Sequence, residues 1–127
     1  MESFIYFNKM YCIDSIVFNA VDLINDCIII QNKDVTGREE SLDNWILCHQ
    51  NDQQSQIIYR FPSLFKLKSG QTIRILSKTS PLTTHLESDT LVADKINTWG
   101  RGQTMITSLI DNNNEEKATI VQKYREQ

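Results

Sequence analysis

The stretch Asn97-Thr98-Trp99-Gly100-Arg101-Gly102 carries one of the two tryptophans and two of the four glycines of the chain. It leads into an apolar run over residues 105–110. Glycine permits positive φ and close backbone approach, and a neighbouring tryptophan can fill a core. A phosphate-binding loop would need a preceding apolar strand, more glycines, a lysine and a following helix, and this stretch has none of them. We therefore expect a tight corner between two strands, with the tryptophan packed inside.

Short runs of β-branched and aromatic residues, separated by polar turn signals, extend along the chain on both sides of this corner. The expected strands cover residues 15–23, 27–30, 42–50, 57–61, 65–68, 72–76, 91–95, 105–110 and 118–124. Residues 65–68 and 72–76 alternate around a Ser-Gly turn, which is the pattern of a hairpin, whereas residues 50–56 are expected to form a loop. The pattern predicts an all-β fold, an antiparallel sandwich or barrel.

Composition limits the possible classes of function. The chain has 127 residues, 40% hydrophobic and 23% charged, as expected of one globular domain with a real core. Its formal net charge of −3 weighs against general nucleic-acid binding, which depends on many lysines and arginines. Cys12, Cys27 and Cys48 are odd in number and show no CxxC spacing, which indicates reduced thiols in an intracellular protein and no metal site. We expect no cofactor.

The adjacent pair Cys48-His49 invites a nucleophile-and-base interpretation. Neighbouring residues on a strand point to opposite faces, so adjacency cannot bring their side chains together. His85 lies in a Ser/Thr-rich segment with no assignable partner. We therefore expect no catalytic residues and no enzyme.

Several blocks resemble one known family. They are residues 28–32 with a polar loop behind them, Asp43-Asn44-Trp45, Tyr59-Arg60-Phe61-Pro62, Phe65-x-Leu67-Lys68-x-Gly70-Gln71, the Trp-Gly corner, and Leu109-Ile110 followed by a turn and Glu115-Glu116. In this order and spacing they resemble the lamin tail domain, the immunoglobulin-like module of nuclear lamins and invertebrate intermediate filament proteins. No coiled-coil heptads precede the blocks. If the sequence is a whole protein, it is most similar to a stand-alone lamin-tail-domain-containing protein; the alternative is a part of a filament protein whose rod lies outside this sequence.

The resemblance implies an immunoglobulin-like sandwich of about nine strands over residues 15–124, with an extension or extra strand over residues 1–14 and a tail over residues 125–127. It implies a non-catalytic protein-interaction or structural module of the nuclear lamina, nuclear envelope or intermediate filaments, in the nucleus rather than the cytoplasm. Lamins or nuclear-envelope proteins would be its partners, without membrane insertion. Chromatin or nucleic-acid binding is the alternative. Positions that are basic in lamins hold Ile29, Gln31, Cys48 and His49 here, which favours the first function.

Individual residues follow from these patterns. We expect a structural core that contains Trp45, Tyr59, Phe61, Trp99, Gly100 and Gly102. Asn32 is expected to cap loop backbone, and the family resemblance implies that Arg60 ties strands together through charge-assisted hydrogen bonds.

Apolar residues also occupy strand positions that should face water. If Trp45 and Leu47 point inward, then Ile46 and Cys48 point outward, and Ile29 does the same on its own strand. We expect Ile29, Ile46 and Cys48 to form one interaction patch. The alternative is that residues 4–12 fold over this patch and cover it.

Overall fold

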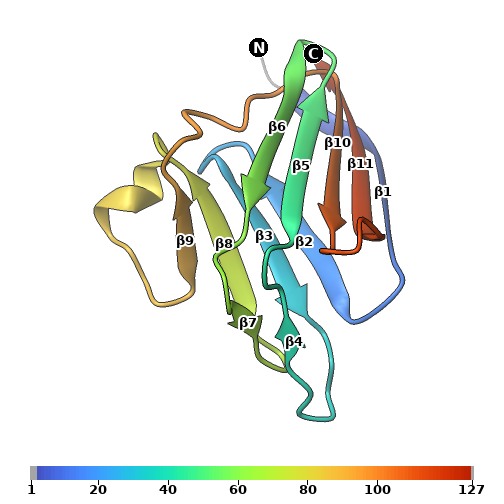
Figure 1. Cartoon of the computed structure of the whole chain (residues 1–127). Coiled ribbons are helices and arrows are strands. Elements are labelled where there is room, and N and C mark those ends of the chain that lie inside the picture. Colours follow the sequence, from blue (N-terminus) through green and yellow to red (C-terminus); the bar gives the residue numbers. More distant parts are fainter. Residues whose placement is uncertain (1–2, 127) are drawn as a thin grey trace.

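Two β-sheets packed face to face build the molecule, as Figure 1 shows. The computed structural model describes residues 3–126, and all long elements in this range are strands. The fold is an immunoglobulin-like β-sandwich, so the expected fold class is confirmed. No helix among the described residues is long and apolar enough to cross a membrane.

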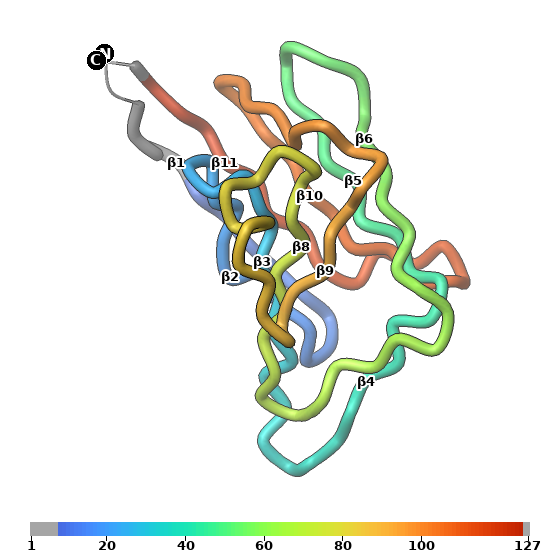
Figure 2. The backbone as a smooth tube through the Cα atoms, turned by 90° about the vertical axis from the view of Figure 1, so that its left-hand side faces the viewer, coloured from blue at the N-terminus to red at the C-terminus, as the bar shows by residue number. Residues whose placement is uncertain are grey.

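The larger sheet has five strands in the order β1-β11-β10-β5-β6. The strands are β1 (Ser3–Cys12), β11 (Glu116–Glu126), β10 (Thr104–Ile110), β5 (Ile46–Asn51) and β6 (Gln54–Arg60). Every neighbouring pair is antiparallel. Figure 2 shows β1 running beside β11 along one side of the sandwich.

The smaller sheet has four strands in the order β2-β3-β8-β9. They are β2 (Ile16–Asp22), β3 (Cys27–Asn32), β8 (Thr72–Ser77) and β9 (Thr90–Ala93). The pair β8–β9 is parallel, unlike the antiparallel pairing expected throughout. A parallel neighbour needs a long crossover, and the connection between these strands, which contains the 3-10 helix η1 (Pro81–Thr84), supplies one.

A third, two-stranded sheet joins β4 (Glu40–Ser41) to β7 (Lys66–Leu67). The expected hairpin of residues 65–68 with 72–76 is therefore wrong, because β7 pairs with β4 whereas β8 pairs with β3. Gly70, at φ 77°, donates its N–H to Asn32 O at 2.8 Å and redirects the chain toward β3. Alternation defines which face a residue occupies, but it does not identify the neighbouring strand.

The polar segment 50–56 is also more ordered than expected. Strands β5 and β6 reach Asn51 and Gln54, which pair across a two-residue turn, so most of this segment is strand. Its side chains are polar because the turn lies at an exposed end of an edge hairpin. With β1 and β4 added to the nine expected strands, residues 3–126 contain eleven.

The core lies between the two large sheets. Alternate residues of the smaller sheet, such as Ile28, Ile30 and Ile75, are fully buried against inward residues of the larger sheet, such as Leu47 and Leu109. Period-two alternation places these side chains on facing surfaces, and their burial supplies the main favourable term in folding.

Terminal boundaries remain predictions. Strand β1 occupies most of the expected extension and pairs with β11, which runs through residue 126 of the expected tail. Residues 1, 2 and 127 lie outside the described part of the chain.

Candidate functional site

The Trp-Gly corner lies on the connection from β9 to β10, where the chain crosses from the smaller sheet to the larger one. Trp99 is 1% exposed and belongs to the core. Its indole Nε1 donates to Ile75 O at 3.2 Å, and its backbone N donates to Asp26 Oδ1 at 3.1 Å. Both acceptors belong to the smaller sheet or its β2–β3 turn. The tryptophan therefore fastens the crossing segment to the sheet that it leaves.

Both glycines of the corner face the turn between β5 and β6. Gly100 has φ 75°, and a Cβ at this position would collide with the side chain of Gln54. A Cβ on Gly102 would collide with the carboxylate of Asp52. The turn between β5 and β6 also holds the corner in place, because Thr104 N donates to Asp52 Oδ1 at 3.2 Å. The glycines thus allow a close contact between the corner and the hairpin.

The other expected core aromatics lie close together. Trp45 and Phe61 are buried in the main core, and Tyr59 is partly buried beside them. The rings of Tyr59 and Phe61 meet edge to face at 5.3 Å, and Phe61 stacks on Phe65 at 5.8 Å. Burial raises the pKa of the Tyr59 hydroxyl, and the nearby charge of Asp94 acts in the same direction.

Asn32 is fully buried and serves the backbone of two other segments. Its Nδ2 donates to Leu67 O and to Arg38 O, each at 3.1 Å, and its Oδ1 accepts from Asp34 N at 3.0 Å. One side chain thus joins β3, β7 and the loop after β3. Asparagine suits this role because its amide both donates and accepts.

Arg60 is exposed at the end of β6. Its Nη1 donates to Asn44 O at 3.3 Å, which links β6 to the turn before β5. Asn44 adopts φ 62°, a left-handed conformation that asparagine tolerates better than most residues. The tie observed for Arg60 is therefore local, between the two strands of one hairpin.

The expected patch of Ile29, Ile46 and Cys48 is not formed. Ile29 lies on β3 of the smaller sheet, whereas Ile46 and Cys48 lie on β5 of the larger sheet. Each points away from the core, so Ile29 lies on the opposite side of the sandwich from the other two. The alternative also differs from the structure, since the backbone of β1 extends the edge of the larger sheet instead of crossing a face.

The larger sheet nevertheless carries several apolar residues on its outer surface, among polar ones. Its outward positions on β6, β5, β10 and β11 hold residues that we call the outer patch: Ile46, Cys48, Ile58, Ile106, Ile110 and Val121. Ile58 is 54% exposed, Cys48 is covered by its neighbours, and the others are half-buried. The run Met-Ile-Thr-Ser-Leu-Ile over residues 105–110 could have pointed to this patch, because it places apolar residues on both faces of the strand.

The Cys48-His49 pair has the geometry of packing residues. His49 is fully buried, its Nδ1 lies 2.8 Å from Thr107 Oγ1, and its ring meets Trp99 edge to face at 6.1 Å. Burial lowers the pKa of His49, although the backbone of Gly100 and the charge of Asp26 act in the opposite direction. Burial also raises the pKa of the Cys48 thiol, which points to the other face of β5. Within residues 3–126, no group of His, Cys, Asp and Glu is placed to hold a metal ion.

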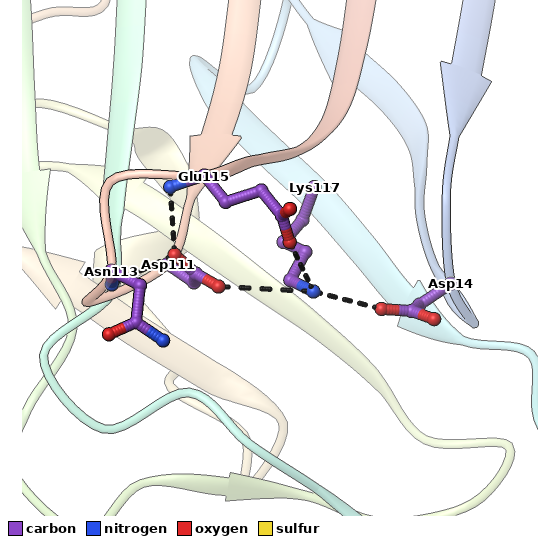
Figure 3. Close-up of polar contacts among 5 residues, drawn as sticks. All are labelled: Asp14, Asp111, Asn113, Glu115 and Lys117. Carbon is purple, nitrogen blue, oxygen red and sulfur yellow. Dashed lines mark hydrogen bonds and ion pairs between the residues drawn. The ribbon is translucent and has the colours of Figure 1, made fainter.

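Figure 3 shows a charge cluster at the β10–β11 turn that sequence reasoning missed. Lys117 Nζ lies 3.0 Å from Asp14 Oδ2, 3.0 Å from Glu115 Oε1 and 3.8 Å from Asp111 Oδ2. The hydrogen bonds to Asp14 and Glu115 raise the pKa of Lys117. Asp111 also accepts the backbone N–H groups of Asn113 and Glu115 at 2.9 Å and so orders the turn.

Replacing Lys117 by methionine is expected to lower the free energy of unfolding by about 1–2 kcal/mol, because three carboxylates would remain close together without their cation. The loss should shrink in 1 M salt, which screens their repulsion. Urea unfolding at low and high salt measures both effects. Lys66→Met is the matched control, since Lys66 meets only the exposed Glu39, at 3.5 Å. Equal losses for the two variants would contradict a role for the cluster.

Comparison with known proteins gives a context for these surfaces. No family model matches the chain. The chain is 37% identical to intermediate filament protein B of Ascaris suum over 87 residues, which are 68% of this chain and 15% of that protein. It is 31% identical to intermediate filament protein ifa-3 of Caenorhabditis elegans over 100 residues, covering 79% and 17%. It is 32% identical to the 70 kDa neurofilament protein of Doryteuthis pealeii over 87 residues, covering 68% and 14%.

The chain thus spans less than a fifth of the length of these three relatives. Over the matched residues, it is similar in sequence to invertebrate intermediate filament proteins.

Proposed function

We propose that this chain is a non-catalytic structural module that makes protein–protein contacts within or beside intermediate filaments. The observation that carries the proposal is the outer patch, an apolar surface on one face of the larger sheet. Exposed apolar surface with polar neighbours is typical of protein interaction sites. The similarity to intermediate filament proteins supports filaments as the setting.

The finer part of the proposal assigns the chain to the lamin tail domain family and its contacts to the nuclear lamina or envelope. The sandwich fold and the blocks around Asn32, Arg60 and Trp99 support this assignment. Nucleic-acid binding is not proposed, because the net charge of −3 disfavours contact with phosphate backbones.

Cosedimentation of the chain with filaments tests both the filament role and the nuclear assignment. The chain is expected to pellet with preassembled filaments and to stay in the supernatant when Ile58→Lys places a charge in the outer patch. Filaments of a lamin and of an invertebrate cytoplasmic protein form the two arms. Ile29→Lys, on the opposite side of the sandwich, is the control and should pellet like the unchanged chain.

Pelleting with neither filament type would contradict the proposed function. Pelleting with the cytoplasmic filaments alone would contradict only the nuclear part. Equal effects of the two lysine substitutions would remove the outer patch as the contact surface.

A further inference from the structure

We propose that the outer patch docks a second copy of this chain, in a two-fold symmetric contact between the larger sheets. The inference rests on the proposed function, because it names the partner of the same surface. It depends on how charged and apolar side chains are distributed across the strands.

One row of paired residues crosses four strands. In the pairing register, Arg60 of β6 lies opposite Ile46 of β5, and Ile46 lies opposite Ile110 of β10. The register shifts after Leu109, and this irregularity places Glu116 of β11 opposite Ile110. The row is therefore basic at one end, acidic at the other and apolar between them. Arg60 and Glu116 are both exposed.

The next row is uncharged, with apolar residues on β6 and β5 and hydroxyl residues on β10 and β11. Ile58, Cys48 and Ser108 lie opposite one another on β6, β5 and β10, and Ser108 lies opposite Thr119 on β11. No charged residue occurs in this row on the four strands. A largely apolar, uncharged centre between two charged ends matches the usual arrangement of a protein interface.

A two-fold axis parallel to the strands, between β5 and β10, makes this surface complementary to itself. Rotation about this axis brings β5 onto β10 and β6 onto β11 of the second copy. Arg60 of each copy then faces Glu116 of the other, and Ile46 faces Ile110. Such a contact is isologous, the commonest form of homodimer contact, and twisted sheets commonly stack face to face in this way.

A second copy fits this distribution better than a partner of one charge. An acidic peptide would satisfy Arg60 and be repelled at Glu116, and a basic peptide would do the reverse. The two-fold contact pairs both ends at once, at the rim, where opposite charges set orientation.

Sedimentation equilibrium of the whole chain over a range of concentrations tests the inference. The unchanged chain is expected to show a monomer–dimer equilibrium. Arg60→Glu and Glu116→Arg, which place like charges opposite each other, should each raise the dissociation constant about ten-fold. The double variant restores opposite charges and should return the constant to within about three-fold of the unchanged chain. Circular dichroism checks that each variant is folded, and Ile29→Lys should leave the equilibrium unchanged.

A chain that stays monomeric at every concentration would overturn the inference, as would a dimer that the double variant fails to restore. If that monomer still pelleted with filaments, the proposed function would stand without its symmetric partner. If the chain formed the dimer but pelleted with no filament, the symmetric contact would stand and the proposed function would be contradicted.

Discussion

Replacing Trp99 by alanine is expected to lower the free energy of unfolding by about 3–5 kcal/mol. The side chain is 1% exposed, so its removal leaves a large cavity between the sheets. It also leaves Ile75 O without the indole donor that lies 3.2 Å away. The cost is high because the residue sits where the chain passes from one sheet to the other, and neither sheet can move inward without disturbing its own hydrogen bonds.

Urea unfolding followed by far-ultraviolet circular dichroism measures this loss. Trp99→Phe is the matched variant, since it keeps much of the apolar volume and loses the indole donor, and it should cost less than the alanine change. A loss below about 1 kcal/mol for Trp99→Ala would show that the corner does not hold the two sheets together.

Replacing Asn32 by leucine is expected to lower the free energy of unfolding by about 3 kcal/mol. Leucine has a similar size, but it cannot serve Leu67 O, Arg38 O or Asp34 N, and each buried backbone group left without a partner costs about 1–3 kcal/mol. Some of these groups can regain water at the loop, which keeps the total below the full sum. The strand β7 and the loop after β3 should loosen first.

Hydrogen exchange at the Asp34 amide, together with urea unfolding, follows this change. Asn19→Leu is the matched control, because Asn19 is exposed and its amide donates to the side chain of Gln31, at 3.1 Å, and not to a buried backbone group. The control should change stability by less than about 0.5 kcal/mol. If the two leucine variants unfolded at the same urea concentration, the buried amide would not hold these segments.

Local features of the chain could be predicted from sequence. Residue spacing alone placed Leu47 and His49 on the inner face of β5, because alternation on a strand is fixed by backbone geometry. The Trp-Gly corner was predictable as well, since few arrangements need two glycines beside a tryptophan.

Relations between distant segments could not be predicted in the same way. Ile29 and Ile46 each point outward as expected, but their strands belong to different sheets, and no local pattern records sheet membership. The cluster around Lys117 was missed for the same reason. Asp14 reaches Lys117 only because β1 pairs with β11, a contact between residues about a hundred positions apart.

The pairing of β1 with β11 also has a mechanical consequence. Ser3 lies opposite Glu126, so the two strands meet at the point where one begins and the other ends. A pulling force applied to these two residues would act across the ladder and open its hydrogen bonds one after another, like a zip. Strands pulled from opposite ends must instead break many bonds together. A stretched polypeptide that contained this sandwich would therefore release β1 at low force and gain length before the main core gave way.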